Sequence, residues 1–112
     1  MTIDELTTIL AATNLPYTYY QYPSNAAPLL PYLVYFFPNM TPVTADNNVY
    51  APIYDVIVEL YTAEKDFNTE EALEAVFFAN NIVYNKSENY INAEHMYQIV
   101  YELGEIIEYG TN

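Results

Sequence analysis

The chain contains no cysteine, no tryptophan and no arginine, and it has only two glycines and two lysines among its 112 residues. Without cysteine, a disulfide scaffold, thiol catalysis and a cysteine-ligated zinc site are all excluded. Two glycines, at positions 104 and 110, leave no glycine-rich loop to cradle phosphates and no dinucleotide-binding turn. These absences exclude the enzyme classes that have the clearest sequence signatures.

Positive charge is also scarce. Lys65 and Lys86 face 15 acidic residues, which gives a formal net charge of -13 at pH 7. Because affinity for nucleic acids comes mainly from neutralising phosphates with Lys and Arg, we expect no direct nucleic-acid binding. The N-terminus is acidic where a signal peptide needs positive charge, and no apolar run approaches the length of a membrane span. We therefore expect a protein that is made in a cytosol, without a membrane partner, and that leaves only within a larger particle.

Hydrophobic residues make up 53% of the chain and tyrosine alone contributes 14 residues. Disorder requires low hydrophobicity together with high charge, so the chain is expected to fold. Its length suits one α+β domain over residues 1–112. All seven prolines lie between Pro16 and Pro52, whereas thirteen of the acids and both lysines lie after residue 45. The middle of the first half is therefore expected to be extended chain interrupted by prolines, and the second half to carry the acidic surface.

Two segments carry helix signals. Thr2 and Glu5 form a capping box ahead of a predicted helix over 3–13, and Asn68 and Glu71 form another ahead of a helix over 69–79. Phe78 lies on the outward face of the second helix, where it is either tucked under by a frayed helix end or exposed to anchor a neighbouring subunit.

The remaining segments read as strands. They are a short strand over 17–22, an unbroken apolar run over 32–37, an alternating segment over 53–62, and a closing hairpin with arms over 82–89 and 94–107. The order predicts a mainly antiparallel sheet of four to five strands with two helices packed on one face. Residues 39–52 are expected to form a long mobile loop or arm, and residues 104–112 a C-terminal tail.

No catalytic or metal site emerges from the sequence. Glu94 and His95 are neighbours, but adjacent residues on the predicted strand point to opposite faces and cannot converge. Asp55 and Glu59 share a strand face at a separation of roughly 13 Å, which exceeds either glycosidase carboxylate spacing. The fragment Asp46-Asn47-Asn48 lacks the closing Glu and the turn Gly of a calcium loop. We therefore expect no enzymatic activity, no cofactor and no metal.

Two helices can cover only one face of a sheet, so the other face is expected to expose aromatic side chains. Such a patch is larger than a monomer usually leaves in water. Tyrosine is enriched at protein interfaces, and an interface of tyrosines surrounded by acids fits this composition. The side chains that we predict at a subunit interface are Tyr35, Phe37, Tyr61 and Phe78.

Several short runs along the chain carry a further signal. They are Leu15-Pro16-Tyr17, the strand from Pro31 to Tyr35, the run from Ile57 to Thr62 followed by Lys65-Asp66 and an acidic helix, and the runs Tyr84 to Glu88 and Met96 to Glu102. Together they resemble small proteins in the structural modules of tailed phages, namely the tail terminators, also called tail completion proteins.

This resemblance implies an α+β subunit of the virion, assembled in the host cytoplasm and located at the tail or neck. Such subunits form a hexameric ring that caps the tail tube and joins it to the head–tail connector. DNA would pass through the ring without being bound, since an acidic lumen repels phosphates.

Two other functions fit parts of the sequence. A DNA-mimic inhibitor would use its carboxylates to occupy a nucleic-acid channel on a basic host protein, with strong sensitivity to salt. A carbohydrate- or peptide-binding module would require a concave aromatic groove, which no sequence feature singles out.

Overall fold

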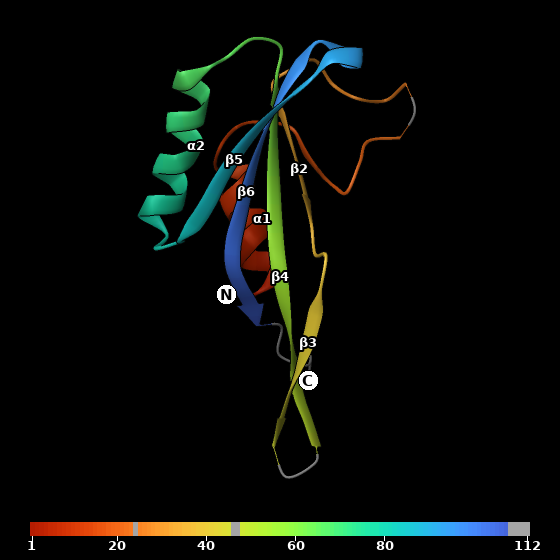
Figure 1. Ribbon diagram of the computed structural model, residues 1–112. Coiled ribbons are helices and arrows are strands. Elements are labelled where there is room, and N and C mark those ends of the chain that lie inside the picture. Colours follow the sequence, from red (N-terminus) through yellow and green to blue (C-terminus); the bar gives the residue numbers. More distant parts are fainter. Residues whose placement is uncertain (24, 46–47, 108–112) are drawn as a thin grey trace.

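The computed structural model describes residues 1–23, 25–45 and 48–107 of the chain (Figure 1). It has two α-helices and a mixed, mostly antiparallel sheet of six strands, so the α+β fold is confirmed with one strand more than the four to five expected. The elements follow the order α1 (Ile3–Ala11), β1 (Tyr17–Tyr19), β2 (Tyr32–Phe36), β3 (Met40–Ala45), β4 (Asn48–Thr62), α2 (Phe67–Ala79), β5 (Tyr84–Ile91), the 3-10 helix η1 (Asn92–Glu94) and β6 (Met96–Ile107).

The long strand β4 organises the sheet. The strand order is β1-β2-β4-β6-β5, and β3 pairs with the first part of β4. All pairs are antiparallel except β1 with β2, which run parallel. In the middle of the sheet Glu59 of β4 lies opposite Val34 of β2 and Val100 of β6. This register places β4 at the centre of the sheet, with neighbours on both edges.

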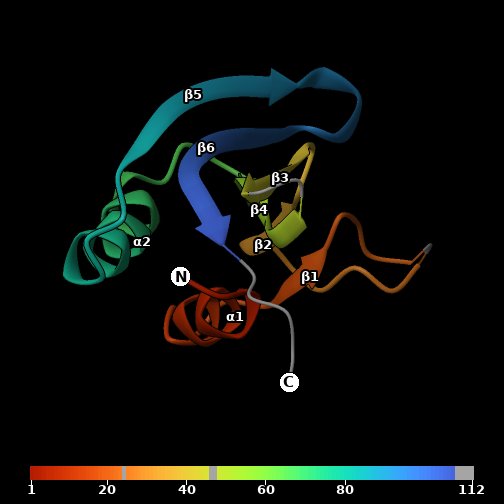
Figure 2. The same cartoon turned by 90° about the horizontal axis from the view of Figure 1, so that it is seen from below.

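Both helices pack on one face of the sheet, which we call the helix face (Figure 2). The alternation predicted for β4 is confirmed, because Val56, Val58 and Leu60 are fully buried while Asp55 is exposed. The opposite face, which we call the open face, carries the odd-numbered residues of this strand. The buried core on the helix face consists of Leu6, Leu10, Leu33, Val56, Val58, Leu60, Leu73, Phe77, Ile82, Ile99 and Tyr101.

The starts of the two helices test the predicted caps. At α1 the Thr2 hydroxyl accepts a hydrogen bond from the Glu5 amide at 3.2 Å, so this cap is confirmed. At α2 the predicted cap Asn68 is wrong, because Asp66 caps the helix and its carboxylate accepts from the Thr69 amide at 3.0 Å. Asp and Asn are comparable N-cap residues, and the Thr69 hydroxyl adds a second bond to Asp66 at 2.6 Å. This second bond favours the earlier start.

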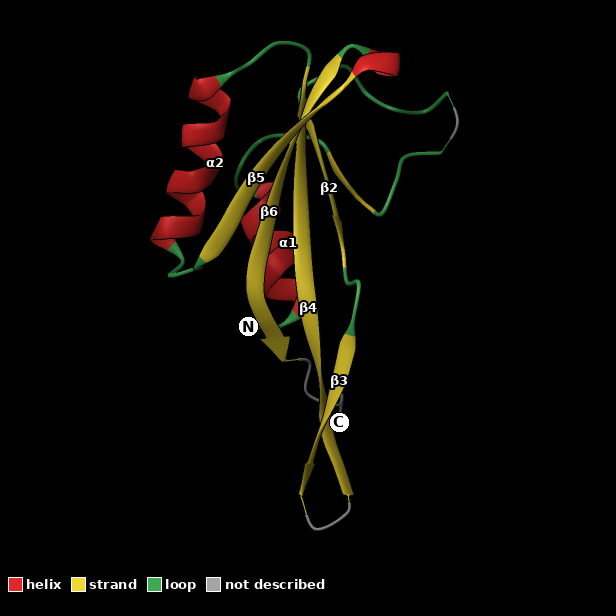
Figure 3. Ribbon diagram, in the orientation of Figure 1, coloured by secondary structure: helices red, strands yellow, loops and turns green. Residues whose placement is uncertain are grey.

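The predicted loop over 39–52 is a hairpin instead, which we call the arm. It comprises β3 and the first residues of β4, and it extends beyond the rest of the sheet with no helix beside it (Figure 3). Pro42 lies opposite Pro52, so both missing N–H donors fall on one step of the ladder. The molecule measures 51 × 31 × 23 Å along its principal axes, and the arm runs along its length. Residues 46 and 47, between β3 and β4 in the sequence, lie outside the described residues.

Two further expectations change at the end of the chain. The second arm of the closing hairpin begins at Met96 instead of Glu94, because η1 occupies 92–94 and His95 takes a left-handed φ of 51°. Of the predicted tail over 104–112, residues 104–107 belong to β6, and 108–112 lie outside the described residues. Neither helix in the described ranges is long and apolar enough to cross a membrane.

Candidate interaction surfaces

A group of aromatic side chains lies on the helix face across the neighbouring strands β1, β2 and β4, and we call it the aromatic strip. Tyr19 packs edge-on against Tyr35 with 5.3 Å between ring centroids, and it lies 5.5 Å from Phe37. Phe37 in turn lies 5.1 Å from Tyr54 on β4. Tyr17 completes the strip at 6.4 Å from Tyr35.

The aromatic strip begins with residues that pack against the core and ends with residues that are exposed to solvent, next to the base of the arm. Tyr35, Phe37 and Tyr54 are partly buried and pack against the core, whereas Tyr17 and Tyr19 remain 37% and 48% exposed. Met40, at the start of β3, lies opposite Tyr54 and is 53% exposed. Since cross-strand partners share a face, the apolar surface continues onto the base of the arm.

The open face is less bare than the sequence suggests, because the connection between β1 and β2 folds over part of it. Tyr20 packs against Phe36 at 5.5 Å and Tyr22 against Tyr32 at 5.1 Å between ring centroids. Beneath this connection Val34 is only 3% exposed. The chain therefore supplies its own cover for the part of the open face near β2.

Tyr61 is held on the open face by two polar neighbours. Its hydroxyl donates to Glu59 Oε1 at 2.8 Å, and the Gln98 amide donates to the Tyr61 oxygen at 3.0 Å and to Glu59 Oε2 at 3.1 Å. Burial, and then the hydrogen bond to Glu59, raise the pKa of Tyr61 well above its usual value. Tyr61 therefore stays neutral and fixed in orientation at physiological pH.

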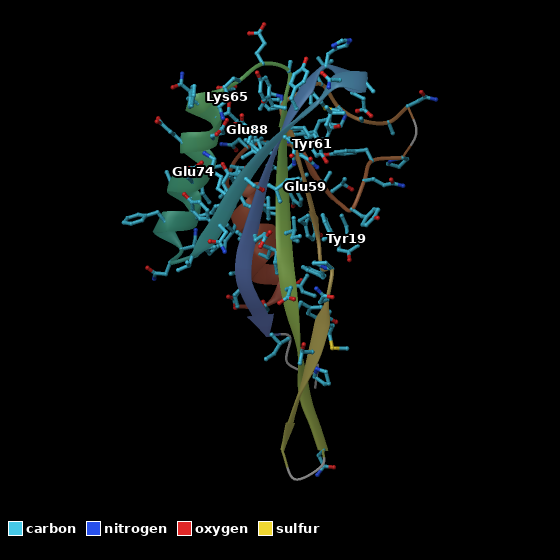
Figure 4. The ribbon with its side chains drawn as sticks, viewed as in Figure 1. Tyr19, Glu59, Tyr61, Lys65, Glu74 and Glu88 are labelled. Carbon is cyan, nitrogen blue, oxygen red and sulfur yellow. The ribbon has the colours of Figure 1, made fainter. Side chains whose placement is uncertain are left out.

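Both lysines are engaged on the helix face, in an ion-pair network around the buried carboxylate of Glu70. Figure 4 labels three of its members, Lys65, Glu74 and Glu88. Glu70 is 1% exposed, with Lys65 Nζ 2.7 Å from its Oε2 and Lys86 Nζ 2.8 Å from its Oε1. Lys65 also pairs with Glu88, and Lys86 pairs with Glu74 at 2.7 Å. We call these five side chains the lysine network.

Tyr101 extends the lysine network into the core, where its hydroxyl donates to Glu74 at 2.7 Å. Burial opposes ionisation of Glu74, but the hydrogen bonds from Lys86 and Tyr101 outweigh it and lower the Glu74 pKa. For both lysines burial acts in the downward direction, and the hydrogen bonds to their carboxylates outweigh it, so the pKa of each is raised. Glu74, Lys65 and Lys86 are thus charged at neutral pH.

The lysine network leaves the two sides of the sheet electrostatically different. Lys86 lies opposite Tyr101, and Glu88 lies opposite Ile99, and both partners are core residues of the helix face. On the open face Asp55, Glu59 and Glu102 have no lysine within 4 Å among the described side chains. The open face is therefore acidic and carries no compensating charge from either lysine.

The four residues predicted at an interface do not come together. Tyr35 and Phe37 belong to the aromatic strip, because Tyr35 lies opposite Val58 of the core, whereas Tyr61 lies on the open face. Phe78 is 84% exposed on α2. The alternative in which a frayed helix end covers Phe78 is wrong, since α2 continues to Ala79.

The pair considered for catalysis lies at the 3-10 helix η1. Glu94 and His95 do not lie on a strand, so the argument from opposite strand faces does not apply to them, and both are exposed. Within the described ranges no group of three or more His, Asp or Glu side chains is placed to hold a metal ion. Asp46 and Asn47 of the fragment compared with a calcium loop lie outside the described residues.

Glu70 is the most important residue that sequence reasoning missed. It lies three residues before Leu73 and seven before Phe77, and therefore on the buried stripe of α2. This spacing was a usable signal for burial, and a buried carboxylate in a chain with two lysines requires one of them as its partner.

No protein-family model and no curated protein matches this chain. Its function therefore has to be argued from the aromatic strip, the arm and the distribution of charge.

Proposed function

We propose that the chain is a structural subunit of a tailed-phage virion: a tail terminator that assembles into a ring, caps the tail tube and joins it to the head–tail connector. The observation that supports this most is the pairing of an exposed aromatic strip with a protruding arm on one small subunit. The proposal assigns the chain no enzymatic activity and no cofactor. Its location would be the tail or neck of the virion, after assembly in the host cytoplasm.

The arm and the aromatic strip both favour association. A two-stranded hairpin is marginally stable in water by itself, so a protruding arm gains most when another surface covers it. The strip exposes tyrosines, which are enriched in interfaces because they combine a large apolar area with a polar end. Each surface is left partly uncovered by the single chain.

A ring needs two different surfaces on each subunit, because each copy contacts one neighbour with one surface and the next neighbour with another. The arm and the strip are two such surfaces. In this arrangement the arm of each copy reaches a neighbouring subunit or the tail tube, and hydrophobic contacts offset the repulsion between subunits of net charge -13.

The charge distribution suits a passage for DNA. Both lysines are paired with carboxylates inside the subunit, so neither is free to hold a phosphate. Carboxylates lining a lumen repel the DNA backbone and keep it moving.

The native mass of the full chain, measured by light scattering over a wide concentration range at moderate salt, tests this proposal. We expect a closed oligomer, a hexamer above all. A monomer at every concentration would contradict a ring that forms in solution.

Two substitutions locate the contacts. Tyr19→Asp introduces a charge into the aromatic strip and Phe78→Asp introduces one on α2, so each is expected to shift the mass toward monomer if its surface is an interface. Val83→Asp is the matched control, because Val83 is 82% exposed between α2 and β5 and lies outside the strip. Dissociation caused equally by all three variants would indicate added charge alone and would contradict these interface assignments.

A DNA-mimic inhibitor is the second candidate, and the acidic open face is the observation that favours it. Such a protein would act as a monomer and bind a basic host protein with strong salt dependence. The light-scattering measurement separates the two functions, since the mimic requires no closed oligomer.

A further inference from the structure

The open face has a hollow at the base of the arm that neither helix nor the β1–β2 connection lines. The hollow measures about 450 Å³, and its lining residues are Pro38, Asn39, Asp55, Val56, Ile57, Glu102 and Leu103. Ile57 and Glu102 lie directly opposite each other on β4 and β6. The hollow thus combines an apolar floor with two exposed carboxylates.

These two carboxylates are unused within the chain. Among the described residues, no lysine lies within 4 Å of Asp55 or Glu102, and no side chain donates a hydrogen bond to either. Glu59, the next acid along β4, already accepts from Tyr61 and Gln98. Asp55 and Glu102 therefore keep their full capacity to accept hydrogen bonds from another molecule.

We propose that this hollow is a docking site for Lys or Arg side chains of a partner protein. The aliphatic stem of such a side chain packs on Ile57, and its cationic head lies between Asp55 and Glu102. The net charge of -13 attracts a basic partner from a distance and repels nucleic acid. The site would thus recognise a basic protein segment.

A second copy of this chain is a poor occupant. Its lysines are both engaged around Glu70 on the helix face, so it has no free lysine to offer, and the chain contains no arginine. The partner is therefore a different protein. This inference concerns a different surface from the aromatic strip and holds whether or not the chain forms a ring.

The test uses the full-length chain and a fluorescein-labelled peptide of alternating Gly and Arg, with fluorescence anisotropy as the readout. Asp55→Asn with Glu102→Gln is expected to weaken binding by about tenfold. Glu64→Gln with Glu71→Gln is the matched control, because it removes the same charge from exposed positions outside the hollow. It is expected to weaken binding less than about twofold.

A third variant tests the apolar floor without changing the charge. Ile57→Ala is expected to weaken peptide binding several-fold, and a thermal melt followed by circular dichroism checks that each variant is folded. Equal losses in the two charge variants would show that the peptide responds only to overall charge, and this would overturn the site. Unchanged binding by the Asp55→Asn/Glu102→Gln protein would overturn it as well.

Discussion

At the scale of single residues, Glu70 shows how a very acidic chain uses its two lysines. A buried carboxylate is costly unless it is paired, and each lysine lies next to a different oxygen of Glu70. Because both cations pair at one buried acid, Glu74 and Glu88 are the only other described acids with a lysine within 4 Å. The net charge of the chain is thus concentrated on its outer surface.

We predict that Glu70→Gln lowers the free energy of unfolding by about 1–3 kcal/mol, because it removes the charge that both lysines face inside the protein. Glu71→Gln, at the neighbouring exposed position, should change it by less than about 0.5 kcal/mol. Urea denaturation at neutral pH measures both values. Equal effects of the two substitutions would show that the lysine network contributes nothing specific.

At the scale of elements, the start of α2 and the arm show where local patterns are ambiguous. Asn68 with Glu71 satisfies the capping-box pattern, yet Asp66 with Thr69 makes the observed bonds. In the arm, turn-forming and β-favouring residues alternate closely, so the sequence favoured a loop where the chain forms a hairpin. At α2 the second hydrogen bond from Thr69 to Asp66 favours the earlier start, and in the arm the pairing of β3 with β4 gives the hairpin.

At the start of α2 the observed cap residue can be compared directly with the predicted one. Asp66→Ala should lower the free energy of unfolding by about 1 kcal/mol, because the Thr69 amide loses its acceptor. Asn68→Ala should have little effect, since Asn68 is exposed inside the first turn. Thermal unfolding measures the two variants, and a larger loss for Asn68→Ala would contradict the observed cap.

At the scale of the whole molecule, the sheet separates two electrostatic environments. The helix face holds both lysines in ion pairs, and the open face holds unpaired carboxylates. The proposed docking of a basic segment therefore belongs to the open face, and the ion pairs of the lysine network belong to the helix face.

Stability should fall at alkaline pH. Burial, and then the hydrogen bond to Glu74, raise the pKa of Tyr101 above its usual value of 10.0, and the pKa values of Lys65 and Lys86 are raised above 10.5. The unfolded chain loses these protons first, so the stabilisation is complete below pH 10 and is lost as the pH rises further.

Tyr101→Phe isolates one of these groups. Above pH 10 the native chain should lose about 1.4 kcal/mol more per pH unit than the variant, although the variant starts less stable because Glu74 has lost a donor. Denaturant titrations between pH 9 and 11 measure the two slopes. Parallel slopes would mean that Tyr101 ionises as readily in the folded chain as in the unfolded one.

Short-range signals made much of the fold predictable. The cap at Thr2, the alternation from Val56 to Leu60 and the order of helices and strands all depend on neighbours within a few residues. The candidate surfaces were harder to predict, because an unbroken apolar run such as 32–37 does not say which residues face the helices. The register with β4 places Tyr35 on the helix face and Tyr32 on the open face.

The sequence by itself determined that this is an acidic α+β chain with two helices on one face of a mainly antiparallel sheet, since composition, capping and periodicity are local properties. Only the tertiary structure decided that Lys65 and Lys86 meet at Glu70, that the arm is a hairpin, and that Asp55 and Glu102 flank one hollow. Each of these depends on strand register and on packing between residues far apart in the chain. Pairing between such distant residues depends on the energy of the whole sheet, and a local sequence pattern does not determine that energy.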